Sequence, residues 1–220
     1  MPQYMIHASP ERMWYVEGYL IPSMKAQGIR EADITVWNDR QGKGNLASCL
    51  ESFGSVARAP GGTWHLQDDV ILSRSFAQAT RDNNEGVVCG FYCRNFGPIA
   101  QAGRVPVRFM WYSFQCLRLP NALAGEFVEW FHTDGKFRPC YKDILREGKG
   151  DDSFFRDFVL EKHPELWVTN LAPCIADHID FLIGGTLVNQ ARLIQVNRAE
   201  YWNDEDLVRQ LEDRLRNEKR

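Results

Sequence analysis

The 220-residue chain lacks any long apolar run. No stretch approaches the roughly 20 consecutive apolar residues that a membrane-spanning helix requires. Residues 1–10 also lack the basic start and the apolar core of a secretory signal peptide. No internal repeat or low-complexity segment is visible. We therefore expect a cytoplasmic protein with no membrane span.

The sequence also has few closely spaced cysteines and no large excess of either charge. The six cysteines are scattered, only Cys89 and Cys93 lie close together, and no second pair completes a zinc-type set. We interpret them as reduced thiols, mostly in the core, as is usual in the cytoplasm. The formal net charge of −3 excludes a strongly basic protein built to bind polyanions over its whole surface, but it leaves a local basic groove open.

Large aromatic side chains are abundant. Seven Trp and thirteen Phe stand in a chain whose contents of apolar residues, 44%, and charged residues, 25%, are ordinary. Such a composition predicts a globular protein with a substantial core, and the length favours one domain over two. The aromatic residues indicate packing or binding through large flat surfaces.

Strand-like and helix-like segments alternate in the first part of the chain. Ser9-Pro10-Glu11 is typical of a helix start, and Pro22 is expected to kink or end that helix, by Gly28 at the latest. We predict strands over residues 4–8, 34–37, 64–66 and 86–92, and helices after Ser9, over 46–53 and over about 73–81. This alternation predicts an α/β fold, with a mixed, mainly parallel sheet flanked by helices in a single domain.

The second half of the chain is less regular. Residues 94–105 are loop-like, residues 107–116 are strand-like and aromatic, and Asn121 begins a helix. A polar stretch then leads to Asp151-Asp152, which opens a further helix with phenylalanines on one side. Leucines spaced by four residues predict a last helix over 203–216. We predict one domain over residues 1–202 and a C-terminal helical segment over 203–220.

Carboxylates follow two of the predicted strands. Asp39 comes after the strand over 34–37, and Asp68-Asp69 come after the strand over 64–66. In α/β sheets, ligands sit outside the carboxyl ends of the strands. Buried paired carboxylates need a counter-charge, because an isolated ionised carboxylate is costly to desolvate. A divalent metal that holds an anionic ligand supplies it, and two solvated acids at a strand end are the open alternative.

Two further polar sites lie later in the chain. Asp151-Asp152 begins a helix, where one carboxylate has the alternative role of a simple N-cap. His178 stands between Asp177 and Ile179, shortly before the apolar stretch that leads to Gly184. A lone histidine in such a context is most often an ordinary core or surface residue.

The order of these features resembles that of a GT-A glycosyltransferase. Three features occur in the same order along the chain as in this family. They are a strand followed by Gln67-Asp68-Asp69, a helix start at Gly150-Asp151-Asp152, and a late His178. The resemblance spans most of the chain, and its strongest segments are residues 64–70 and 149–155. It implies a donor-binding half over about 1–100 and an acceptor-binding half over about 101–202.

The resemblance also implies roles for the acidic motif. Asp69, the last acid of the motif, is expected to bind Mn²⁺ or Mg²⁺ that bridges the diphosphate of the sugar donor, with Asp68 near the ribose or the metal. Gln67 stands where the family's full acid-x-acid pattern has a carboxylate, so this loop provides fewer direct ligands. His178 is the expected second metal ligand. Oxygen ligands with at most one histidine suit Mn²⁺ or Mg²⁺ better than zinc.

Further donor contacts follow from the same resemblance. Asp39 matches the residue that reads the nucleobase. The end of the first strand, His7-Ala8-Ser9, is expected to line the same pocket, and Arg12 to reach the donor. Four aromatic residues are candidates for stacking on the base or the sugar, namely Trp37, Trp64, Trp111 and Tyr112. Each of them is also a candidate core residue. The expected donor is a nucleotide sugar, most simply a UDP-sugar.

The expected catalytic base is Asp152, with Asp151 beside it. An acceptor hydroxyl has a pKa far above 7, so a carboxylate must take its proton as the oxygen attacks the anomeric carbon. The leaving nucleoside diphosphate gains negative charge, which a metal offsets as a Lewis acid. The resemblance therefore implies an inverting transferase of the hexosyltransferase type.

The acceptor and two other functional classes stay open. Compact members of the family act on glycan precursors, on small molecules, or, in phage-infected host cytoplasm, on hydroxymethylated DNA bases. Basic residues cluster in the second half and suit either a polyanionic acceptor or a solvated surface, namely Arg94, Arg104, Arg108, Arg138, Lys142 and Arg146. A metal-dependent phosphoesterase or nuclease would also gather carboxylates and a histidine. A binding module whose acids only cap structural elements is the third alternative.

Overall fold

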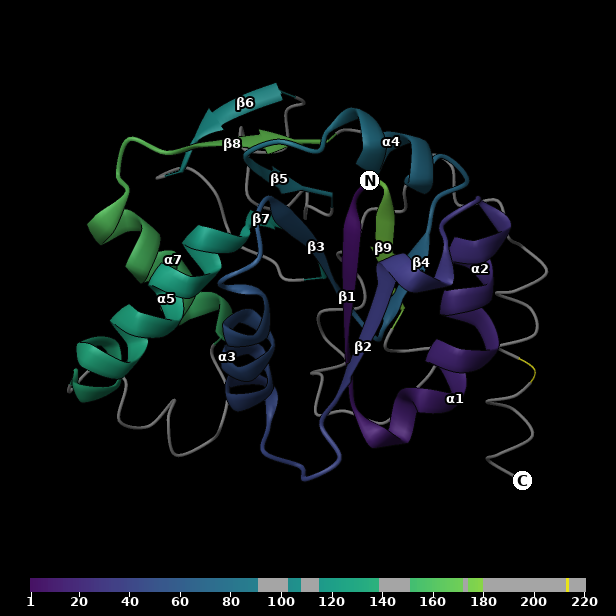
Figure 1. Cartoon of the computed structure of the whole chain (residues 1–220), viewed down its shortest axis with the longest axis horizontal. Helices are drawn as coiled ribbons and strands as arrows, with labels where there is room; N and C mark the ends of the chain where they lie inside the picture. The colour runs from purple at the N-terminus through teal and green to yellow at the C-terminus, as the bar shows by residue number, and fades with distance from the viewer. Residues whose placement is uncertain (91–102, 108–114, 139–150, 172–173, 180–212, 214–220) are drawn as a thin grey trace.

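The fold was analysed in a computed structural model of the chain (Figure 1). The structure describes residues 1–90, 103–107, 115–138, 151–171, 174–179 and 213. None of the helices among these residues is long and apolar enough to cross a membrane.

A seven-stranded mixed sheet forms the centre of the α/β fold (Figure 1). Its order is β2-β1-β3-β7-β5-β8-β6, and every strand except β7 and β6 runs in the same direction. The strands are β1 Gln3–Ala8, β2 Ile34–Asn38, β3 Gly62–Gln67, β5 Val87–Cys89, β6 Gly103–Pro106, β7 Cys116–Pro120 and β8 Trp167–Asn170. A separate antiparallel pair is made by β4 Val70–Leu72 and β9 Ala176–His178. The mixed, mainly parallel sheet predicted from the sequence is confirmed.

Helices cover both faces of the sheet (Figure 1). One face carries the first helical segment and α4, and the other carries α3, α5 and α7. The first segment consists of the 3-10 turn η1 Pro10–Arg12, α1 Met13–Tyr15, the π-helical turn η2 Val16–Leu20 and α2 Ile21–Ala26. The remaining elements are η3 Glu31–Asp33, α3 Asn45–Val56, α4 Phe76–Asp82, α5 Asn121–Thr133, η6 Gly135–Phe137 and α7 Asp151–Lys162.

The alternation of side chains along each strand creates two cores. Tyr4, Ile6 and Ala8 of β1 point to the core under the first helical segment, as do Trp64 and Leu66 of β3. The opposite core is aromatic and gathers side chains from α3, α5 and α7, of which the phenylalanines are Phe53, Phe127, Phe131, Phe154, Phe155 and Phe158. The abundance of phenylalanine in the sequence therefore serves packing between these three helices and the sheet.

The first helix changes its hydrogen-bond pattern just before Pro22, without a break in the helical backbone. Pro22 has no backbone N–H to donate to a carbonyl of the preceding turn. The widened π-helical turn Val16–Leu20 comes directly before α2, the helix that contains Pro22. A π-turn of this kind accommodates a break in the regular hydrogen-bond pattern. The segment ends at Ala26, and Gly28 adopts a positive φ of 83° as expected for a helix terminator.

Several elements differ from the sequence predictions. The strand predicted over residues 107–116 is wrong at Val107, which follows β6, and at Gln115, whereas Cys116 begins β7; residues 108–114 are outside the described part. β4, β6, β8 and β9 were not predicted, because three or four residues are too few to display a periodic pattern. β6 corrects the end of the stretch over residues 94–105 that was expected to be a loop. The predicted helix over 203–216 lies outside the described residues except for Asp213, which is helical.

The thiol assignment is confirmed where the structure describes it. Cys49, Cys89, Cys116 and Cys174 are buried thiols outside any disulfide. Burial raises the pKa of the Cys116 thiol well above its ordinary value, and the nearby Cys89 and Cys174 add to the effect. Cys93 and Cys140 lie outside the described residues.

Candidate functional site

The carboxyl ends of β1, β2 and β3 meet at one edge of the sheet. β1 lies between the other two and is parallel to both, with Ala8 opposite Asn38 and His7 opposite Gln67. The loops that follow these strands therefore leave the sheet side by side, and they carry the predicted donor residues. The chain moves from β1 to one neighbour and then returns to the other, which is the kind of reversal where α/β proteins bind ligands.

The acidic pair after β3 holds a buried arginine. Nη1 of Arg12 lies 2.9 Å from Oδ1 of Asp68 and 2.5 Å from Oδ2 of Asp69. The backbone N–H of Ser9 donates to the other oxygen of Asp68 at 2.6 Å. Arg12 is 1% exposed, Asp68 6% and Asp69 5%, so water screens this cluster little. The counter-charge that the paired acids require comes, in this structure, from a guanidinium.

Burial and charge act against each other in this cluster. Burial would lower the pKa of Arg12, but the charges of Asp69 and Asp68 outweigh it and raise the pKa above its ordinary value. The pKa of Asp68 is raised by burial first and by the charge of Asp69 second, against the opposing effect of Arg12. Removing one partner of a buried ion pair costs about 3–5 kcal/mol, so the cluster contributes strongly to the shape of this edge.

The donor set at this edge suits the predicted metal. Carboxylate oxygens are the ligands that Mg²⁺ and Mn²⁺ prefer. The pairing of β4 with β9 places the backbone of His178 opposite Val70, the residue after Asp69, and Ile179 N–H donates to the Asp69 carbonyl at 2.7 Å. The side chain of His178 lies outside the described part. Among the described residues no group of three or more metal-ligating side chains is present, so the metal site stays a prediction.

Asp39 shapes the loop that follows β2. Its N–H donates to the carbonyl of Ala8 at 2.9 Å, and its carboxylate accepts the backbone N–H of Lys43 at 3.0 Å and of Gly44 at 2.9 Å. These bonds close the loop that leads into α3. Both carboxylate oxygens thus contact the loop backbone, and the predicted contact with a nucleobase stays a prediction.

Asp152 lies on a different element from the acidic pair. It stands in the first turn of α7, and its Oδ1 accepts the backbone N–H of Ser153 at 2.7 Å. The helix start predicted at Asp151-Asp152 is confirmed, while the side chain of Asp151 is outside the described part. Within the described residues no hydrogen bond or ion pair joins Asp152 to Asp68 or Asp69.

A second polar group lies on the aromatic side of the same strands. Its members are the half-buried His7, which was expected to line the donor pocket, and the buried His65 and Ser52, which were not singled out from the sequence. Nε2 of His7 is 2.9 Å from Nδ1 of His65, and Nδ1 of His7 is 3.2 Å from Oγ of Ser52. The Ser52 hydroxyl donates to the carbonyl of Cys49 at 2.8 Å, so it accepts from His7. His65 then donates through Nδ1, and its Nε2 is an acceptor with no partner among the described residues. The sequence offered one signal for this contact: each of the two neighbouring strands β1 and β3 carries a histidine on the same face of the sheet.

Burial favours the neutral form of both histidines. Burial lowers the pKa of His7 to about 4. Burial also lowers the pKa of His65 well below its ordinary value, and the neighbouring His7 lowers it further. His65 lies against the ring of Phe53, with 4.5 Å between ring centroids. An imidazolium here would lose its hydration without gaining a carboxylate partner among the described residues.

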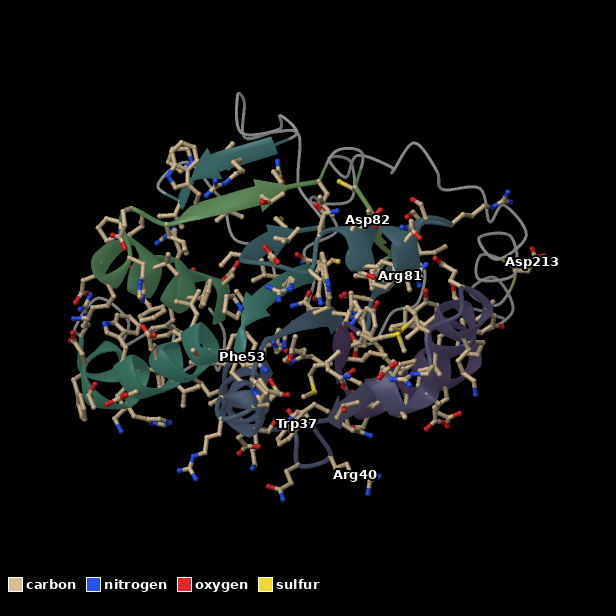
Figure 2. All side chains as sticks on the ribbon, turned by 45° about the horizontal axis from the view of Figure 1, so that its top comes forward. Trp37, Arg40, Phe53, Arg81, Asp82 and Asp213 are labelled. Atoms are coloured by element: carbon tan, nitrogen blue, oxygen red, sulfur yellow. The ribbon has the colours of Figure 1, made fainter. Side chains whose placement is uncertain are left out.

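The aromatic stacking candidates separate into two groups. Trp64 is 0% exposed within the core, so of its two expected roles the core role is confirmed and stacking on a ligand is excluded. Trp37 and Arg40 lie at the carboxyl end of β2, near α3, which carries Phe53 (Figure 2). Trp111 and Tyr112 lie outside the described residues. Trp37 is therefore the candidate for stacking that the described structure leaves at this edge.

The basic residues of the second half are described only in part. Arg138 is held by Asp134 at 2.8 Å and also pairs with Glu161, and the guanidinium of Arg104 lies over the ring of Trp167. Arg94, Arg108, Lys142 and Arg146 are outside the described part. A basic acceptor surface stays a prediction.

Comparison with known protein families and with curated proteins finds no match to this chain.

Proposed function

We propose that the protein is a nucleotide-sugar-dependent glycosyltransferase of the GT-A type, which moves a sugar from a donor, most simply a UDP-sugar, to an acceptor hydroxyl. One observation carries the proposal. The loops after β1 and β3 are joined at the carboxyl edge of the sheet through Ser9, Arg12, Asp68 and Asp69, where α/β folds bind their ligands. The resemblance of the acidic motif to that family supplies the reaction class.

In this proposal the edge of the sheet binds the donor. The backbone turn after Ala8 and Ser9 provides a surface for the nucleotide, and the loop closed by Asp39 lies beside it. Asp69 and His178 would hold Mn²⁺ or Mg²⁺, which supplies Lewis-acid stabilisation of the diphosphate. Gln67, at the end of β3, contributes a neutral side chain where a further acid would add negative charge beside the diphosphate.

In this proposal Asp152 receives the proton of the acceptor hydroxyl. A carboxylate at the start of a helix is attached to a rigid element, and the Ser153 N–H holds one of its oxygens. The other oxygen is then the atom that takes the proton as the acceptor oxygen attacks the anomeric carbon. Direct attack from the face opposite the leaving nucleotide inverts the configuration of the sugar.

Thermal unfolding in the presence of Mn²⁺, UDP and both together tests this function. We expect a clear rise in Tm with both ligands, because a ligand that binds only the folded protein stabilises it by about 2.7 kcal/mol at a hundred times its Kd. Stabilisation by the metal alone would instead favour a phosphoesterase or nuclease, and no shift with any nucleoside diphosphate would favour a binding module. The Asp69→Asn variant serves as the matched control and is expected to lose the joint effect.

A further inference from the structure

We propose that Arg12 is an internal cation that occupies the Asp68–Asp69 pair in the ligand-free protein and makes it indifferent to divalent ions until a nucleotide binds. This inference rests on the proposed function and concerns the same site. It starts from the two short contacts that join one guanidinium nitrogen to both carboxylates. All three residues are almost fully buried, so their charges interact strongly.

The charge balance of the cluster supports this role. Two carboxylates and one guanidinium leave a single formal negative charge, whereas the pair without Arg12 carries two. A divalent ion added while Arg12 is in place changes the local formal charge from −1 to +1, which is unfavourable in a buried place. A diphosphate brings the negative charge that compensates. Metal and nucleotide are therefore expected to bind cooperatively, each raising the affinity for the other by the same factor.

The backbone contact of Asp68 adds a second effect. Ser9 N–H and Arg12 hold both oxygens of this carboxylate, and both residues belong to the turn after β1. The loop after β3 is thus fixed to the neighbouring loop before any ligand arrives. A preformed loop reduces the conformational cost of donor binding. Arg12 is in this sense a positioning residue, because it acts on the donor site through the two acids.

The substitution Arg12→Met tests the proposal through stability rather than activity. Loss of the buried cation is expected to lower Tm by about 10 °C. Mn²⁺ alone should restore at least half of that loss, because the ion takes the place of the missing charge, whereas Mn²⁺ alone should leave the Tm of the wild type almost unchanged. Mn²⁺ that stabilises the wild type as much as the variant would overturn the proposal, as would a variant that Mn²⁺ does not restore.

Arg118→Met is the matched control. Arg118 is also buried, at 5% exposed, but it bonds to the neutral oxygens of Asn84 and Gly86. We expect this variant to lose stability without any recovery in Mn²⁺. Recovery in both variants would mean that the metal acts elsewhere, which contradicts the proposal.

Two further variants keep the test decisive if Arg12→Met does not fold. Arg12→Lys keeps the charge and should remain insensitive to Mn²⁺, so a large shift with the metal alone would contradict the internal-cation role. In Arg12→Met/Asp69→Asn the second charge is also removed, and we expect higher stability than in Arg12→Met and no effect of Mn²⁺. A wild type that binds UDP with Mn²⁺ while these expectations fail sinks this inference alone. A wild type that binds no nucleotide under any condition sinks the proposed function.

Discussion

The Asp152→Asn variant is expected to lose sugar transfer by a factor of about 10²–10⁴ while it keeps its affinity for UDP. An amide at this position cannot take the proton of the acceptor hydroxyl. It still offers an oxygen to the Ser153 N–H, so the first turn of α7 is expected to keep its structure. Initial rates with radiolabelled nucleotide sugars, together with calorimetric titration of UDP, measure the two effects separately.

A neighbouring carboxylate on the same helix provides the control for this substitution. Asp157 lies further along α7 and pairs with Arg156 at 2.8 Å, so Asp157→Asn changes the charge of the helix without changing its start. We expect its transfer rate to match that of the wild type. Full activity in Asp152→Asn would show that another group takes the proton. A joint loss of transfer and of UDP binding would point to damage to the fold instead.

The free energy of unfolding is expected to fall as the pH is lowered from 6.5 towards 4, because of His7 and His65. The pKa of His7 is lowered from 6.5 to about 4 in the folded protein, so the unfolded chain binds more protons between these values. The stabilising contribution is therefore complete above pH 6.5 and is lost as the pH falls towards 4. A shift of this size corresponds to about 3 kcal/mol in the free energy of unfolding. The lowered pKa of His65 acts in the same direction.

Urea unfolding at a series of pH values checks this expectation. Among the described residues, Asp68 opposes this effect, because its raised pKa favours the folded protein at low pH. A comparison with a variant is therefore more informative than the wild-type curve alone. His65→Leu should show a weaker dependence on pH between 6.5 and 4 than the wild type. Equal curves for the two proteins would contradict the account.

The architecture was largely predictable because local patterns agree with the fold. Apolar runs bounded by turn residues predicted β1, β2 and β3, and the start of the first helix at Ser9-Pro10-Glu11 follows from capping preferences that act within a few residues. The start of α7 at Asp151-Asp152 was predictable for the same reason. These signals are local, and the sequence contains them in full.

The details of the site depend on pairings between distant residues. Arg12 lies 56 and 57 residues from the acids it contacts, and no pattern in the sequence joins them. The contact between His7 and His65 likewise spans 58 residues and arises because β1 and β3 are neighbours in the sheet. The sequence indicated that the acids need a cation, and metal was the natural expectation. Only the folded arrangement of the two loops reveals that Arg12 meets part of that need.

A crystal structure with UDP and Mn²⁺ bound tests the central claim most directly. Anomalous scattering locates the manganese independently of the protein atoms. The account predicts manganese on the carboxylate of Asp69 and in contact with the diphosphate, at the edge where β1, β2 and β3 end. UDP bound at any other surface, or manganese away from Asp69, would contradict it.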